Sequence, residues 1–289
     1  MTTMDSRLFK EHRGKAIRTS RTIRAGMLQD VANVVIPRSN GSSILAFKAG
    51  PTQNSPLSSK APILILIHEF WGLAPEICSK AEALANELGC IVIAPDTYRG
   101  QSTRFIPKAI FLALSTPQDR VNEDLDEVLS WASTLSSVDT QKVGIMGFCY
   151  GGGKAIRYAS HYRNVKGVAV IYGKLLLDLE ALKCIKGSVL GIFGDKDTQF
   201  PMKEINAFKD ALHNAGIKCQ ISVYEGQGHA FWYDMDQVSA AESLFLHKSI
   251  SAHSSQIRGT SVECQVHSKS IFCLFLLGKL EWSIVQSEF

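Results

Sequence analysis

The chain has 289 residues, of which 45% are hydrophobic and 20% are charged, and its formal net charge is +4. This length and composition are those of one globular α/β domain with a sizeable core. The basic excess is concentrated before residue 25 instead of along a folded face, so we predict no nucleic-acid partner. No segment approaches the roughly 20 apolar residues needed to cross a bilayer, so we predict no membrane partner either.

Residues 1–29 are basic and have no apolar segment of the kind found in a secretory signal. We interpret this stretch as a disordered extension, with an organelle transit peptide as the alternative. The seven cysteines include no CxxC pair and no Cys/His spacing suited to zinc. Free thiols fit a reducing compartment, so we predict a cytoplasmic protein without a metal ion.

From about residue 30, apolar runs alternate with amphipathic stretches, which is typical of a mostly parallel sheet with helices on both faces. Residues Val31–Pro37 and Ser43–Lys48 are predicted to form an antiparallel pair, with Asn40-Gly41 as the turn signal. Several later runs are apolar on both faces, as buried parallel strands are. Six further strands are predicted at Ile63–Ile67, Ile91–Ala94, Val143–Met146, Val168–Ile171, Val189–Phe193 and Ile221–Tyr224.

Apolar residues recur at helical spacing from Val121 to Leu135 and predict a helix that leads into the strand at 143–146. Ser115-Thr116 are potential caps, and Pro117 is expected in the first turn. After about Leu246 the alternation stops, and no internal repeat supports a second domain. The sequence therefore predicts an α/β domain over residues 30–246 and an unassigned C-terminal tail over residues 247–289.

A motif that carries chemistry follows the strand at residues 143–146. Gly147-Phe148-Cys149-Tyr150-Gly151 has the form of the nucleophile elbow G-x-S-x-G, with sulfur in place of oxygen. Such a strained turn requires small residues two positions either side of the nucleophile, and Gly147 and Gly151 meet that requirement. The following helix N-terminus favours a thiolate and a developing oxyanion. On this motif alone, a bystander cysteine or a phosphate-binding loop is the alternative, although no GKS or GKT follows.

The elbow predicts an acid and then a base at the ends of later strands. Gly194-Asp195-Lys196-Asp197 follows one predicted strand, and Gly228-His229-Ala230 comes shortly after the next. His229 is the predicted base. Spacing alone leaves Asp195 and Asp197 both open as the acid.

The strand Ile63–Ile67 ends in His68-Glu69-Phe70-Trp71-Gly72, where this fold supplies a second oxyanion-hole amide. We predict that the backbone amides of Phe70 and Tyr150 form this hole. A charged Glu69 at the end of an apolar strand is costly unless it is paired or useful, and a capping or solvent-facing carboxylate is the alternative. His68 is interpreted as a packing or hydrogen-bonding residue.

With these residues in view, the chain resembles the dienelactone hydrolase (carboxymethylenebutenolidase-like) family of α/β-hydrolases over roughly residues 31–232. Five motifs, in this order and spacing, make the resemblance specific. They are Glu69-Phe70-Trp71-Gly72, Ala94-Pro95-Asp96-Thr97-Tyr98-Arg99-Gly100, Gly147-Phe148-Cys149-Tyr150-Gly151-Gly152, Gly194-Asp195-Lys196-Asp197 and Gly228-His229-Ala230-Phe231.

The resemblance implies that Cys149 is the nucleophile, His229 the base and Asp197 the acid that orients it. It also implies that Glu69 interacts with the cysteine at rest and helps to generate the thiolate once substrate binds. The implied reaction is hydrolysis of a small ester or enol lactone through an acyl-cysteine intermediate, with no cofactor or metal. A thiolate suits esters with good leaving groups.

One departure from the family concerns the substrate. In the bacterial members that cleave dienelactone, the residues after the catalytic histidine are polar and basic and hold a substrate carboxylate. In this chain Ala230, Trp232 and Tyr233 come after His229 instead. Arg99, near the position of the family's other carboxylate-binding arginine, and Trp232 are candidate substrate contacts, with a structural role as the alternative for Arg99. We therefore expect a more apolar or different ester, cleaved by a monomer.

Two other functions stay open at this point. A thioesterase or general carboxylesterase could use the same residues. A catalytically silent scaffold for partner binding, with Cys149 as a redox-sensitive thiol, is the alternative from another class.

Overall fold

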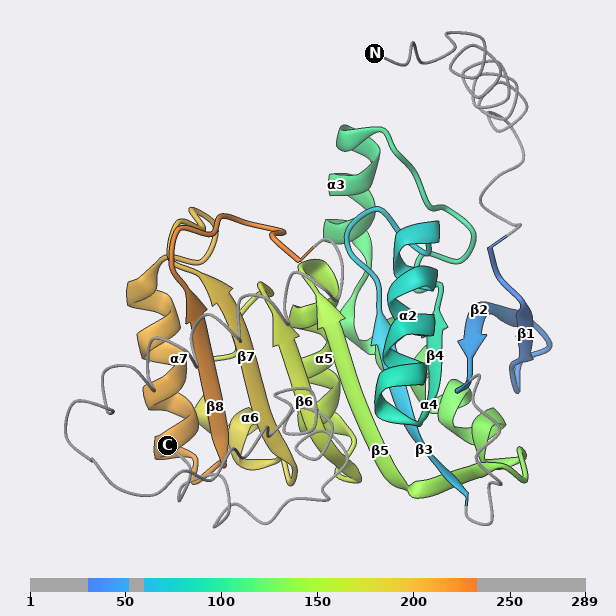
Figure 1. Cartoon of the computed structure of the whole chain (residues 1–289). Coiled ribbons are helices and arrows are strands. Elements are labelled where there is room, and N and C mark those ends of the chain that lie inside the picture. The colour runs from blue at the N-terminus through green and yellow to red at the C-terminus, as the bar shows by residue number, and fades with distance from the viewer. Residues whose placement is uncertain (1–30, 52–59, 233–289) are drawn as a thin grey trace, which may run out of the picture.

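Eight strands form one sheet at the centre of the described chain (Figure 1). The computed structural model describes residues 31–51 and 60–232. The predicted basic extension at residues 1–29, the end of the predicted domain after residue 232 and the tail at residues 247–289 lie outside these ranges. Among the described residues, none of the helices is long and apolar enough to span a bilayer.

The strand order across the sheet is β1-β2-β4-β3-β5-β6-β7-β8. The first two strands run antiparallel to each other and β2 runs antiparallel to β4, whereas every other pair is parallel. All eight predicted strands are therefore confirmed. They are β1 (Val34–Pro37), β2 (Ser43–Ala49), β3 (Ala61–Ile67), β4 (Ile91–Pro95), β5 (Val138–Phe148), β6 (Val165–Ile171), β7 (Ser188–Gly194) and β8 (Cys219–Tyr224).

Strand β5 begins at Val138, before the predicted start at Val143. Its first residues pair with the beginning of β3, and the register shifts between Pro62 and Ile63. The polar residues between Asp139 and Lys142 hide this early segment from a hydrophobicity pattern, because the strand becomes fully buried only from Val143 onward.

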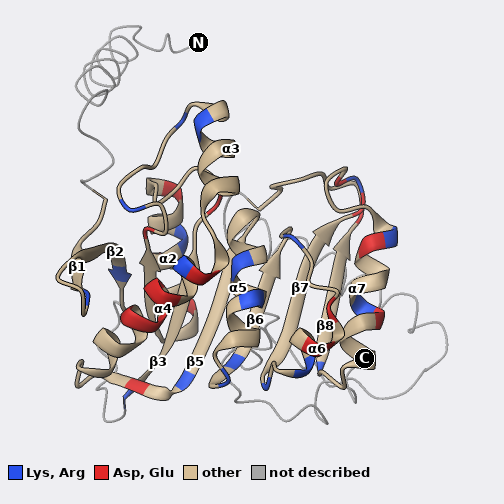
Figure 2. Cartoon of the chain, turned by 180° about the vertical axis from the view of Figure 1, so that it is seen from behind, with Lys and Arg blue, Asp and Glu red and all other residues tan. Residues whose placement is uncertain are grey.

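Helices cover both faces of the sheet, as the sequence predicts. Buried side chains of α2 pack on one face, and those of α4, α5, α6 and α7 pack on the other. Figure 2, seen from behind, shows acidic and basic residues interspersed on α7, whereas the charged residues of α4 are mainly acidic. The helices are α2 (Pro75–Leu88), α3 (Ile106–Ser115), α4 (Gln118–Ser133), α5 (Tyr150–His161), α6 (Leu179–Lys183) and α7 (Met202–Asn214).

The predicted cap of α4 was wrong in detail. Pro117 is the N-cap residue itself, with extended backbone angles, and the helix begins at Gln118. The residue before a proline is pushed out of the helical region, so Thr116 is extended as well and its side chain is not in a capping position. Its hydroxyl donates to the Leu112 carbonyl at 2.7 Å and accepts from Arg120 at 2.8 Å.

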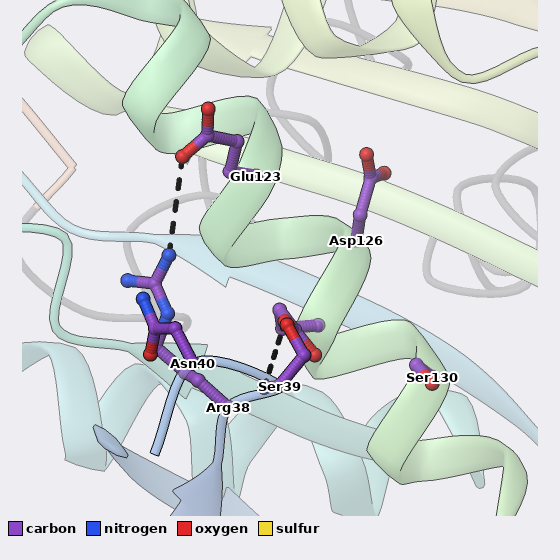
Figure 3. Close-up of a pocket in the computed structure, with 7 residues that line it drawn as sticks. Arg38, Ser39, Asn40, Glu123, Asp126 and Ser130 are labelled. Atoms are coloured by element: carbon purple, nitrogen blue, oxygen red, sulfur yellow. Dashed lines mark hydrogen bonds and ion pairs between the residues drawn. The ribbon is translucent and has the colours of Figure 1, made fainter. Parts of the chain in front are cut away.

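A polar junction joins the β1–β2 hairpin to α4, beside a shallow pocket (Figure 3). Arg38 forms an ion pair with Asp124, whose side chain is 1% exposed. The backbone amide and hydroxyl of Ser39 both donate to Glu127, at 3.1 and 2.5 Å. These contacts hold the antiparallel edge of the sheet against the helix that precedes β5. We call Arg38, Arg99 and Asp124 the α4 junction below.

Candidate active site

Cys149 lies in a strained turn between β5 and α5. Its backbone angles are φ 51° and ψ −112°, a conformation that costs a non-glycine residue about 1–3 kcal/mol. A Cβ atom on Gly147 would lie 2.1 Å from the carbonyl oxygen of Gly151, and one on Gly151 would lie 2.3 Å from that of Ile67. Larger side chains would therefore displace backbone, which is the physical reason for glycine at both positions.

The structure brings His229 and Asp197 together with Cys149. The imidazole Nε2 lies 3.1 Å from the Cys149 sulfur, and Nδ1 lies 2.8 Å from Asp197 Oδ2. A buried carboxylate requires a donor, so the imidazole carries its proton on Nδ1 and presents Nε2 as an acceptor to the thiol. The three side chains form one continuous line of hydrogen bonds from the ends of β5, β7 and β8.

The two aspartates that spacing left open have different partners. Asp197 is buried and also accepts the backbone amides of Gln199, at 2.8 Å, and Phe200, at 3.4 Å. Asp195 accepts the amide of Gly226 at 2.6 Å and so joins the loops that follow β7 and β8. The geometry thus favours Asp197 as the acid and gives Asp195 a turn-holding position.

The environment of Cys149 keeps its thiol protonated at rest. Burial, together with the nearby charges of Glu69 and Asp197, raises the pKa of Cys149 to about 12. The backbone N–H of Tyr150 points at the sulfur and acts in the opposite direction. At neutral pH Cys149 therefore carries a thiol, next to the ring of His229.

Glu69 lies close to Cys149 but is held by other groups. Its Oε1 atom accepts from Lys80 Nζ at 3.4 Å and from the Tyr172 hydroxyl at 3.2 Å. The resting contact with the cysteine that the resemblance implies is not among the hydrogen bonds of the described residues, where the sulfur faces His229 instead. Glu69 is thus a paired, partly buried carboxylate, not a solvent-facing one.

The amides of Phe70 and Tyr150 were predicted to form an oxyanion hole. Phe70 follows β3, and Tyr150 opens α5 directly after Cys149. Among the backbone hydrogen bonds of the described residues, neither amide donates to a carbonyl, and the Tyr150 N–H points at the Cys149 sulfur. Such preorganised donors stabilise charge that develops on a carbonyl oxygen.

His68 is hydrogen-bonded to Glu69 and Thr97. Its Nε2 accepts from the Thr97 amide at 3.2 Å, so its proton lies on Nδ1, which donates to the Glu69 carbonyl at 2.6 Å. Burial lowers the pKa of this imidazole, which keeps it neutral. Thr97 Oγ1 also contacts the Tyr150 hydroxyl at 3.2 Å, which connects the ends of β3, β4 and β5.

The two predicted substrate contacts have structural partners. Arg99 belongs to the α4 junction, where Nη2 lies 2.9 Å from Asp124 Oδ1 and Nε lies 3.4 Å from Oδ2. Trp232 is 2% exposed, and its ring packs edge-on against Phe148 with centroids 5.6 Å apart. Both contacts explain these side chains without a substrate, so their substrate-binding roles stay predictions.

Sequence reasoning missed Lys80 and Tyr172. Lys80 lies on the buried face of α2, where an isolated lysine gives no pattern signal. Tyr172 directly follows β6, and its position at a strand end was a signal that could have been used. Its ring lies 5.4 Å from that of His229, and Phe200 flanks the same imidazole at 5.9 Å. Aromatic side chains thus flank the imidazole.

Sequence comparison places the chain among known proteins. The model of the "Dienelactone hydrolase family" matches residues 45–252. The chain belongs to this family. A dienelactone hydrolase relative from Methylorubrum extorquens, named "Putative carboxymethylenebutenolidase", is 32% identical over 215 residues, which cover 70% of this chain and 72% of that protein. A protein of the same name from Escherichia coli K12 is 33% identical over 207 residues, or 67% of this chain and 74% of its own.

Solved structures agree with this family and its fold. The "Putative Dienelactone Hydrolase" from Klebsiella pneumoniae superposes with a TM-score of 0.65 at 28% identity, covering 74% of this chain and 95% of that one. The dienelactone hydrolase-like P91 from metagenomic libraries, at 17% identity, gives 0.62 over 74% and 95%, which supports the fold alone. This dienelactone hydrolase family member is therefore a hydrolase with the predicted α/β-hydrolase fold.

Proposed function

We propose that this protein hydrolyses a small ester or enol lactone, with Cys149 as the nucleophile, His229 as the base and Asp197 as the acid that orients His229. The observation that carries the proposal is the unbroken line of contacts from Asp197 through His229 to the sulfur, at 2.8 and 3.1 Å. Family membership supports the same reaction class.

In the acylation step the Cys149 sulfur attacks the ester carbonyl carbon while His229 Nε2 accepts the thiol proton. The carbonyl electron pair moves onto oxygen, which the amides of Phe70 and Tyr150 stabilise. The intermediate collapses to an acyl-cysteine as the alkoxide or enolate leaves and takes the proton from His229. In a lactone the leaving oxygen stays tethered to the acyl group.

In the second step water attacks the acyl-cysteine carbonyl and gives a proton to His229. Collapse of this intermediate expels the thiolate and releases the carboxylic acid, and the sulfur recovers its proton from His229. Asp197 keeps the imidazole in one orientation and stabilises its cationic form in both steps. Glu69, beside the sulfur, is proposed to assist thiolate formation when substrate is bound.

A substrate screen with matched variants tests the proposal. The wild-type protein should hydrolyse p-nitrophenyl acetate or an enol lactone, and Cys149→Ala and His229→Ala should abolish that hydrolysis while the circular dichroism spectrum is retained. Cys149→Ser keeps the shape of the site and serves as the control for the sulfur. Undiminished hydrolysis after complete covalent labelling of Cys149 would contradict the proposal.

A further inference from the structure

We infer that Lys80 is a positioning residue of this site: its ammonium, together with the Tyr172 hydroxyl, holds the Glu69 carboxylate and offsets its charge beside the nucleophile. The inference rests on the proposed function for the role of Cys149 and goes beyond it by naming what controls that thiol. Lys80 acts through Glu69 and is not itself a catalytic residue.

The placement of Lys80 is unusual for a lysine. Its side chain is 9% exposed, on the face of α2 that packs against the sheet. The ammonium lies 3.4 Å from Glu69 Oε1 and 4.5 Å from the centre of the Phe148 ring. Phe148 is the residue directly before Cys149. Lysines are rarely buried unless they are paired, so the carboxylate and the aromatic face together account for its position.

Tyr172, directly after β6, supplies the second donor to Glu69 at the same edge of the sheet. Its hydroxyl donates to the same Oε1 atom at 3.2 Å, and its side chain is fully buried. Its backbone has φ 36°, a left-handed value that is uncommon for a bulky residue. Two donors on one oxygen hold Glu69 toward α2 and β6, which is consistent with the sulfur having His229 as its partner.

The effect of Lys80 on the Cys149 thiol depends on which charged groups lie near that thiol. The charges that raise the pKa of Cys149 are those of Glu69 and Asp197, and His229 contacts the sulfur directly. Lys80 faces Glu69 and, one turn earlier on α2, Glu76, which is bound to Arg104 at 2.5 Å. Removing the ammonium therefore leaves the Glu69 charge uncompensated beside the sulfur and makes the thiolate harder to form.

Alkylation of Cys149 by iodoacetamide measures this effect without any ester. We would follow the labelling rate of the Cys149 peptide by mass spectrometry in the full chain between about pH 7 and about pH 11, since only the thiolate reacts. Lys80→Met should slow labelling at about pH 9 by about threefold or more and move the profile to higher pH, whereas Lys80→Arg should stay within about twofold.

The decisive comparison is made in a Glu69→Gln background. In the substrate-free protein, where the Glu69 charge disfavours the thiolate, Glu69→Gln alone should speed labelling. Adding Lys80→Met to it should change the rate by less than about twofold, because the two residues act as one unit. An equal slowing by Lys80→Met with and without Glu69, or no slowing at all, would overturn the inference.

A further variant covers the case in which Lys80→Met does not fold. Tyr172→Phe removes only the hydroxyl and should slow labelling by about twofold in the same Glu69-dependent way. An unchanged rate would count against the proposed hold of Lys80 and Tyr172 on Glu69. Since no ester is present, failure of the proposed hydrolysis would leave these rates measurable. Loss of the Lys80 effect would in turn leave the proposed hydrolysis standing.

Discussion

Asp197 and Asp124 are two equally buried carboxylates with different partners. Their side chains are 0% and 1% exposed. Asp197 receives two backbone amides and the imidazole of His229, whereas Asp124 receives the guanidinium groups of Arg38 and Arg99. An imidazole changes its protonation near neutral pH and a guanidinium does not. The partner, and not the burial, thus separates the carboxylate proposed to act in catalysis from one in a structural junction.

Asp197→Asn should give the largest effect. The amide would disturb the orientation and tautomer of His229 and could not stabilise its cationic form, so kcat/KM for p-nitrophenyl acetate should fall by about 10³-fold or more, with little change in Tm. Asp195→Asn is the matched control, because Asp195 accepts from the Gly226 amide and pairs with Lys196, and it should lower kcat/KM by about threefold at most. The reverse order of the two variants would assign the acid to Asp195.

Asp124→Asn should show the opposite behaviour. The change leaves Arg38, whose side chain is 6% exposed, without its buried counter-ion, and should lower the free energy of unfolding by about 3 kcal/mol. The residual folded protein should keep its kcat, since Asp124 touches none of the residues proposed to react. Urea unfolding with parallel assays checks both parts, and a stable but inactive variant would erase the distinction between the two carboxylates.

Arg99→Met should have a smaller effect on stability. Its side chain is 42% exposed and Asp124 keeps Arg38, so a loss of about 1 kcal/mol is expected. If Arg99 serves only the α4 junction, kcat/KM should be unchanged within about twofold for neutral and carboxylate-bearing esters alike. A selective loss of more than about tenfold with the carboxylate-bearing ester would instead support the predicted substrate contact.

The smallest expected effect is a difference in stability at alkaline pH between the wild-type protein and Cys149→Ala. Burial raises the pKa of Cys149 to about 12 in the folded protein, above the ordinary cysteine value of about 8.5. The resulting stabilisation is fully present below about pH 8.5 and is lost as the pH rises toward about 12. The Tm of wild-type protein should therefore fall more steeply between about pH 8 and about pH 10 than that of Cys149→Ala. Parallel curves would show that Cys149 titrates normally.

Much of the fold could be predicted because buried parallel strands leave continuous apolar runs, such as Ile63–Ile67. The helices were harder: α3 follows a loop after β4, and several of its large apolar side chains, including Phe111 and Leu114, are exposed. A pattern that assumes buried apolar faces does not identify such a helix. The polar start of β5 was missed for a related reason.

The candidate site divides in the same way. Cys149, Asp197 and His229 each follow a strand in chain order, so their meeting at one edge of the sheet could be expected from sequence. Lys80 could not, because it comes from a helix, and although Tyr172 follows a strand, no sequence pattern pairs it with Glu69. Such contacts depend on how side chains cross between elements, which local patterns do not encode.

The most direct test of the central claim is to trap the acyl-enzyme. Wild-type protein and Cys149→Ser would be mixed with p-nitrophenyl acetate, quenched in acid within the first turnover and digested for mass spectrometry. The account predicts one acetyl group on the Cys149 peptide of the wild-type protein, formed at the rate of the initial release of p-nitrophenol. Rapid hydrolysis with the acetyl group on another residue, or with Cys149 never modified, would contradict it.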